Sequence, residues 1–230
     1  MRQHANLMKK QDNKNPIQGD SSRAVHAGTN RKKVLNAINT PIVQSATYTF
    51  ENTAALVEFL EAKTWGKGEK NRDEYGRYGN PSISAVEKRL AALEGGDDAV
   101  LYSSGMAAIT TLLLTVLKSG QHVVMTDDTY RRTRQFCEET LGKFGIETTV
   151  VPVGDYDALE KAVIKGKTRF IISETPTNPY LRVADLERIR NLAKANRCLT
   201  MIDTTFATPI NLRPLEWGID FVLHSGPKYL

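Results

Sequence analysis

VLYSSGMAAITTLLLTVL, residues 100–117, contains no charged side chain and changes character near its middle. A short apolar run comes first, Ser103-Ser104-Gly105 follows, and the rest has the composition of a buried helix. The segment is nearly long enough to span a bilayer. Its Ser-Ser-Gly turn and three threonines instead favour a strand, a turn and a helix inside a globular domain. We therefore predict a strand at Ala99–Tyr102 and a helix at Gly105–Lys118.

This alternation of short apolar runs and helical segments continues to the last residue. Five more strands are predicted, at His122–Met125, Thr148–Val153, Arg169–Ser173, Cys198–Ile202 and Phe221–His224. Three more helices are predicted, at Tyr130–Lys143, Tyr156–Lys165 and Leu186–Ala195. Continuous apolar strands that alternate with helices are typical of a mainly parallel sheet covered on both faces. The sequence thus predicts an α/β fold, a three-layer α/β/α domain.

The first 45 residues have no clear periodicity and are interpreted as an irregular N-terminal arm. A helix is expected within residues 50–66, and another begins at Pro81, after the capping residue Asn80, and stops at Gly95-Gly96. The polar N-terminus lacks the apolar core of a secretory signal. Cys137 and Cys198 form no CxxC or metal-ligand spacing, so neither a disulfide framework nor a metal site is predicted. A reducing, cytoplasmic location is expected.

The overall composition is that of an ordinary globular protein. Of the 230 residues, 40% are hydrophobic and 25% charged, and the net charge is +5. The basic residues are not gathered into one stripe with interleaved aromatics, as in nucleic-acid binders. We therefore expect neither a nucleic acid nor a membrane as partner.

Ligands of such sheets bind beyond the carboxyl ends of the strands, and reactive side chains occur at those ends. Gly105 lies in a strand-to-helix turn that could cradle a phosphate, and Tyr130 opens a helix. Asp203 and Lys228 follow the last two strands. Taken singly, these residues could belong to an ordinary turn, a packing contact, a helix cap and a solvated loop.

Together, these residues are the parts needed to hold pyridoxal 5'-phosphate (PLP). A lysine can form an imine with its aldehyde, a buried carboxylate can keep its ring nitrogen protonated, and an aromatic side chain can cover its ring. A nucleotide-binding module without covalent chemistry remains an alternative. It accounts for the sheet and the turn but not for Asp203 and Lys228, and no GxGxxG follows a strand.

The chain resembles the Cys/Met-metabolism family of PLP-dependent enzymes, which has an aspartate-aminotransferase-type fold. The motifs that carry the resemblance run in order from residue 22 to residue 230. They are RAVHAGT, PIVQSATYTF, EYGRYGNP, SSGMAAI, ETPTNPYLR, IDTTFATP and HSGPKY. EYGRYGNP and TYRRTR are most similar to the plant-type cystathionine γ-synthases.

The resemblance implies a role for each matching residue. Lys228 is the Schiff-base lysine and the catalytic base, and Tyr130 is the ring-stacking and second catalytic residue. Asp203 is the partner of the ring nitrogen, and Asn178 that of the ring hydroxyl. The remaining cofactor-binding residues hold the phosphate: Gly105, Met106 and Ser225 from the same chain, and Tyr75 and Arg77 from a neighbouring subunit.

Two departures from the family pattern are present. Gly226-Pro227 replaces the usual Ala-Thr before the lysine, and proline offers neither a hydroxyl nor an N–H to a phosphate. Family chains also continue into a C-terminal domain. The expected organisation is therefore an arm (1–45) and a PLP-binding large domain (46–230) that is truncated before an absent C-terminal small domain.

The implied activity is that of a transsulfuration enzyme of cysteine and methionine metabolism, a cystathionine γ-synthase. It would replace the γ-substituent of an activated homoserine with cysteine. The alternatives are a cystathionine or methionine γ-lyase, an O-acylhomoserine sulfhydrylase, or an inactive truncated remnant. The implied partners are amino-acid substrates and further copies of the chain, as a dimer with shared sites within a tetramer. Arg131, Arg132 and Arg134 could bind an anionic substrate group or form a solvated helix face.

Overall fold

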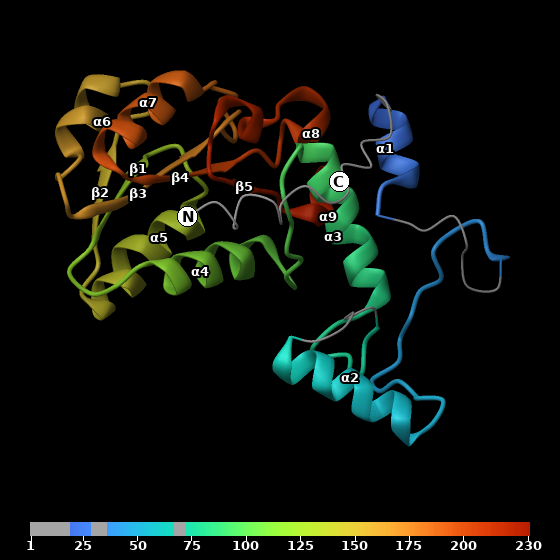
Figure 1. The fold of residues 1–230 in the computed structure, drawn as a ribbon. Coiled ribbons are helices and arrows are strands. Elements are labelled where there is room, and N and C mark those ends of the chain that lie inside the picture. The colour runs from blue at the N-terminus through green and yellow to red at the C-terminus, as the bar shows by residue number, and fades with distance from the viewer. Residues whose placement is uncertain (1–18, 29–35, 67–71) are drawn as a thin grey trace, which may run out of the picture.

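A computed structural model describes residues 19–28, 36–66 and 72–230. Five strands form one parallel sheet in the order β2-β1-β3-β4-β5 (Figure 1). Their bounds are β1 His122–Thr126, β2 Glu147–Val151, β3 Thr168–Glu174, β4 Leu199–Asp203 and β5 Phe221–Leu223. The predicted parallel sheet is confirmed, with strand bounds shifted by one or a few residues.

Helices cover both faces of this sheet, which gives the three layers that the sequence predicted (Figure 1). One face packs against α4 (Gly105–Val116) and the segment of α5 (Arg131–Gln135), η2 (Phe136–Thr140) and η3 (Leu141–Phe144). The other face packs against α6 (Tyr156–Ala162) and α7 (Leu186–Asn196).

Neighbouring residues of a strand enter opposite cores. Val123 and Met125 pack with the α4 layer, whereas Val124 between them packs with the α6–α7 layer. This alternation follows from the pleat of a strand, which turns successive side chains to opposite faces. β1 is therefore apolar at both odd and even positions, as its continuous apolar run in the sequence indicated.

The N-terminal part contains α-helices, of which the two after residue 50 were predicted. They are α1 (Asp20–His26), α2 (Thr53–Trp65) and α3 (Pro81–Glu94). The interpretation of residues 1–45 as irregular is wrong for α1, which packs against α3. Arg213, distant in sequence, forms ion pairs with Asp20 and Glu216. The rest of the predicted arm before residue 19 and at 29–35 lies outside the described residues.

The predicted strand Ala99–Tyr102 does not form. Its residues are coil, and the N–H groups of Ala99 and Leu101 donate to the side chains of Asp98 and Glu87. A strand needs a neighbour to take its backbone hydrogen bonds, and within the described ranges no strand lies beside this segment. The helix predicted at Tyr130–Lys143 begins at Arg131 and passes through α, π and 3₁₀ geometry.

Short helices follow the last two strands. They are α8 (Thr208–Asn211) and η4 (Pro214–Trp217) after β4, and α9 (Gly226–Tyr229) after β5. Among the helices of the described ranges, none has the length and apolarity needed to cross a membrane.

Candidate active site

Lys228 and Tyr130 face each other at the carboxyl edge of the sheet. Lys228 lies in α9, directly after β5, and its Nζ is 5.4 Å from the centroid of the Tyr130 ring. Tyr130 immediately precedes α5, and 45% of its surface is exposed. The Lys228 amine and the face of the Tyr130 ring come from segments almost a hundred residues apart. Together they can form two sides of a site for a planar ligand.

A chain of hydrogen bonds joins Asp203 to the segment that carries Lys228. Asp203 ends β4 and is 9% exposed. Its Oδ1 accepts hydrogen bonds from the N–H (2.9 Å) and the hydroxyl (2.6 Å) of Thr205. The same Thr205 hydroxyl accepts the N–H of Ser225 at 2.9 Å. Asp203 Oδ2 receives no hydrogen bond from the described residues, so this oxygen can accept one from a ligand.

Gly105 and Ser225 bring the start of α4 into contact with the segment that follows β5. A Cβ added at Gly105 would lie 3.2 Å from Ser225 Cβ and 3.4 Å from Ser225 Oγ, so glycine permits this close approach. Within the described chain, the N–H groups of Gly105 and Met106 and the Ser225 hydroxyl have no hydrogen-bonding partner. Donors at the start of the 12-residue helix α4 suit an anion. Pro227 lies in the first turn of α9 and contributes no donor.

Glu174 is a site residue that the sequence analysis did not single out. It ends β3, is 5% exposed, and is paired in register with Asp203. Its Oε2 accepts the Tyr130 N–H at 2.7 Å, and its Oε1 accepts the Asn178 N–H at 3.2 Å. Burial, and secondly the charge of Asp203, raise the pKa of Glu174 to about 7. The signal available in the sequence was its place at a strand end, in ETPTNP.

The strand-end cluster consists of Lys228, Tyr130, Asp203, Gly105, Ser225 and Glu174. Asn178 and Met106 lie at its margins. Asn178 is exposed, and the bond from its backbone to Glu174 holds it beside the strand ends. Met106 is half-buried, and its sulfur accepts a long hydrogen bond of 3.8 Å from the Thr133 hydroxyl. The Met106 side chain therefore packs under α5 while its N–H is part of the helix start.

Tyr75 and Arg77 are not brought to this cluster. Tyr75 pairs with Thr47 in an isolated antiparallel bridge, and the Arg77 guanidinium lies 5.1 Å from the Tyr75 ring centroid. In the described part of the chain, no hydrogen bond or ring contact joins either residue to Lys228 or Tyr130. Both belong to the segment that connects α2 to α3.

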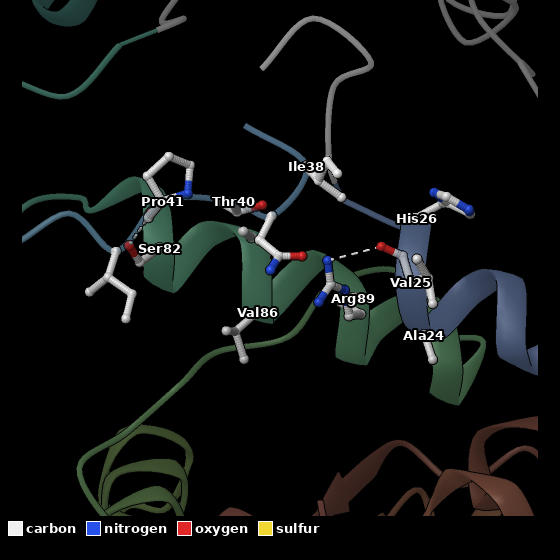
Figure 2. Close-up of a pocket in the computed structure, with 12 residues that line it drawn as sticks. Ala24, Val25, His26, Ile38, Thr40, Pro41, Ser82, Val86 and Arg89 are labelled. Carbon is white, nitrogen blue, oxygen red and sulfur yellow. Dashed lines mark hydrogen bonds between the residues drawn. The ribbon is translucent and has the colours of Figure 1, made fainter. Parts of the chain in front are cut away.

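A hollow of about 460 Å³ lies elsewhere, between α1, residues 38–42 and α3 (Figure 2). Arg89 crosses it and donates to the Val25 carbonyl at 3.2 Å. Its lining contains none of the strand-end residues. We place the candidate site by its chemistry, at the sheet edge, and not by the size of this hollow.

The strand-end cluster fits PLP by its donors and acceptors. Gly105, Met106 and Ser225 offer unpaired donors to a phosphate, Asp203 keeps one free oxygen for a ring N–H, and Lys228 supplies an amine. These features on a three-layer α/β/α domain define the class of PLP-dependent enzymes. Comparison with known families identifies the family within this class. Residues 21–230 match the model of the Cys/Met metabolism PLP-dependent enzymes, and the chain belongs to that family.

Individual relatives carry several activities. The chain is 42% identical over 216 residues to cystathionine γ-synthase 1, chloroplastic, of Nicotiana tabacum, covering 93% of this chain and 39% of that protein. It is 38% identical to a cystathionine β-lyase of Lactococcus lactis, covering 91% and 51%. A Campylobacter jejuni structure assigned as an O-acetylhomoserine (thiol)-lyase, with a pyridoxyl-lysine monophosphate, has a TM-score of 0.82 and 31% identity, covering 93% and 50%.

The chain thus spans about half the length of these relatives, or less. Family membership supports the PLP-dependent interpretation over a nucleotide-binding module. Within the ranges that the structure describes, His, Cys, Asp and Glu side chains form no group that could hold a metal ion. Burial, and secondly the charge of Glu138, raise the pKa of Cys137 to about 12, so this thiol is a poor nucleophile.

Proposed function

We propose that the chain is the PLP-binding part of a cystathionine γ-synthase. The observation that carries this proposal is the link from Asp203 through Thr205 to Ser225, which sets the Lys228 segment beside a carboxylate that has one free oxygen. The similarity to the tobacco γ-synthase supports the choice of branch. Lyase and sulfhydrylase activities are the alternatives for this chain, because it is also similar to a β-lyase and a (thiol)-lyase.

Each residue has a distinct task in this proposal. The Asp203 Oδ2 atom accepts the ring N–H and keeps the ring cationic. Gly105, Met106 and Ser225 bind the phosphate, Tyr130 covers the ring, and the Asn178 side chain meets the ring hydroxyl. When bound, PLP supplies an electron sink that acidifies the hydrogens of the substrate beside the amino group. The Lys228 amine holds and moves the proton at the substrate α-carbon.

The overall reaction replaces one group on the γ-carbon of the substrate. The bond from the γ-carbon to its activating oxygen breaks, and the leaving group keeps the electron pair. The sulfur of cysteine then bonds to the γ-carbon and loses its proton, which gives cystathionine. Arg77 and Tyr75 serve the phosphate of a neighbouring subunit in this proposal, since within the described ranges neither contacts the cluster of its own chain.

Product analysis tests the proposed activity. The purified protein, supplied with PLP, an activated homoserine and cysteine, is expected to form cystathionine at a rate well above any release of pyruvate or 2-oxobutyrate from cystathionine. Mass spectrometry of the products measures both reactions, and sulfide in place of cysteine tests sulfhydrylase activity. Predominant keto-acid release would assign the protein to a lyase branch, and predominant homocysteine formation from sulfide to a sulfhydrylase branch.

The three arginines near Tyr130 are expected to contribute unequally to substrate choice. Arg134 donates to the Asp127 carbonyl and Arg132 to the Gln135 side chain, so both are engaged within the protein. Arg131 is exposed next to Tyr130 and has no hydrogen-bond or ion-pair partner among the described residues. We expect Arg131→Ala to raise KM for a phosphorylated homoserine about tenfold, the scale of one charge-assisted hydrogen bond, with little effect on an acylated one.

The matched variant for this comparison is Arg134→Ala, which removes the same charge from the same helix. It is expected to lower activity on both substrates equally, because its guanidinium holds the Asp127 loop. Steady-state kinetics of both variants on both substrates measures the difference. An equal loss for the two substrates in Arg131→Ala would contradict a phosphate-binding role.

Assembly and location complete the proposal. We propose a homodimer with shared sites, within a tetramer, because in the part of the chain that the structure describes Tyr75 and Arg77 do not contact their own chain's cluster. The cytoplasmic location predicted from the sequence stays a proposal. It is supported by Cys137 and Cys198, which are both buried and free of disulfide bonds.

A further inference from the structure

Glu174 lies at the centre of the candidate site, but the proposed function described above assigns it no role. Its two carboxylate oxygens bond separately to the backbone N–H groups of Tyr130 and Asn178, at 2.7 and 3.2 Å. These two residues lie in different loops, 48 positions apart, and both are proposed to contact the cofactor ring. One buried side chain therefore sets the backbone position of both.

Glu174 also lies beside a second buried carboxylate. β3 and β4 run parallel and end together, with Glu174 paired in register with Asp203. The N–H of the next residue, Thr175, donates to the Asp203 carbonyl at 3.0 Å. Two adjacent carboxylates with little access to water disfavour each other's negative charge.

The groups that face Glu174 come from every neighbouring element. Asp203 on β4 carries a negative charge, Lys228 on α9 a positive one, and the loops of Tyr130 and Asn178 supply the two N–H donors. Burial and the Asp203 charge raise the pKa of Glu174 to about 7, against the opposing effects of the two N–H groups and Lys228. Near neutral pH, part of the protein thus carries a proton on this side chain.

We propose, resting on the PLP-binding function above, that Glu174 positions Tyr130 and Asn178 and releases a proton when Asp203 accepts a cationic ring N–H. A cation beside Asp203 cancels the negative field that holds the proton on Glu174. The resulting carboxylate is a stronger acceptor for both N–H groups than the neutral acid. Binding of the ring cation therefore tightens the two loops that border it.

The sign of the pH dependence follows from linkage. The pKa of Glu174 is about 7 in the free protein and falls when the cation is bound. Binding then releases a proton, so affinity increases as the pH rises through 7. If the pKa in the complex lies well below 6, this group alone raises affinity about tenfold between pH 6 and pH 8.

The test uses a probe that cannot attach to Lys228, namely 4'-deoxypyridoxine 5'-phosphate, which keeps the ring nitrogen and the phosphate but lacks the aldehyde. Titration calorimetry between pH 6 and 8, in two buffers of different ionisation enthalpy, measures affinity and proton release together. The wild-type protein is expected to show about a tenfold greater rise in affinity than Glu174→Gln. The probe's own ionisations are the same for both proteins.

The matched control is Asp220→Asn. Asp220 also accepts two hydrogen bonds, from the N–H and hydroxyl of Thr200, but at the start of β4, away from the site. It is expected to lower thermal stability without changing the pH dependence. Equal pH dependence in the wild type and a folded Glu174→Gln would overturn the proposal.

If the Glu174→Gln variant does not fold, a measurement on the wild-type protein can still test the proposal. Infrared difference spectra at pH 6 are expected to show loss of a protonated-carboxyl band when the probe binds. If the band persists, or never exists in the free protein, the proposal is wrong. Failure of PLP itself to attach to the wild-type protein would instead contradict the proposed function, because the Glu174 measurements do not use the aldehyde.

Discussion

Lys228→Ala is expected to abolish covalent attachment of PLP and to lower turnover about a thousandfold, within the range for loss of a catalytic base. The amine of Lys228 lies 5.4 Å from the Tyr130 ring centroid, on a segment that Ser225 and Thr205 join to Asp203. Alanine keeps this hydrogen-bond chain and removes only the amine. The absorbance band near the visible edge, formed by wild-type protein with PLP, should be absent.

Borohydride reduction followed by peptide mass analysis locates the attachment. In the wild-type protein the reduced cofactor should be found on Lys228. Lys161→Ala is the matched control, because Lys161 is an exposed lysine on α6, away from the strand ends. The absorbance band that the Lys161→Ala protein forms with PLP should be the same as that of the wild-type protein. Attachment to a different lysine, or none in the wild type, would refute the assignment.

Mixing two inactive variants is expected to restore activity if sites are shared between subunits. Arg77→Ala damages the phosphate contact given to the neighbour, and Lys228→Ala removes the amine of its own site. In a mixed dimer, one site carries both lesions and the other carries neither. With random pairing, half of the dimers are mixed and half of their sites are intact, so about a quarter of wild-type activity should return.

The structural basis of this expectation is local to the turn before α3. Arg77 stacks near the rings of Tyr75 and Tyr78, at 5.1 and 5.5 Å, and among the described residues it contacts no group of its own chain's cluster. Size measurements and mass analysis must first show that mixed dimers form. If they form and activity does not return, Arg77 acts within its own chain. Two Lys228→Ala preparations mixed together provide the baseline.

Local sequence patterns predicted most of the fold because they record local physics. Apolar runs of strand length and the helical spacing between them located all five strands of the sheet. Capping residues located α3, which begins after Asn80 and ends before Gly95, whose backbone is left-handed. The pattern was insufficient at Ala99–Tyr102, because an apolar run becomes a strand only when another strand accepts its hydrogen bonds.

The candidate site was predicted in part for the same reason. Parallel strands bring their carboxyl ends to one edge, so Lys228, Asp203 and Tyr130 could be expected together from their places after strands. Glu174 was missed because nothing local distinguishes it from any polar residue at a strand end. Its role depends on a hydrogen bond to a residue 44 positions away and on the register of β3 with β4.

By itself, the sequence determined the alternation of strands and helices, the family, and the residue types at each strand end. These depend on side-chain periodicity and on motifs that are contiguous in the chain. Only the tertiary structure decided which groups interact: Thr205 between Asp203 and Ser225, Glu174 between Tyr130 and Asn178, and Arg134 held within the protein. Hydrogen bonds and burial are properties of distance in space, and residues far apart in the chain acquire them only when the sheet has brought its strand ends together.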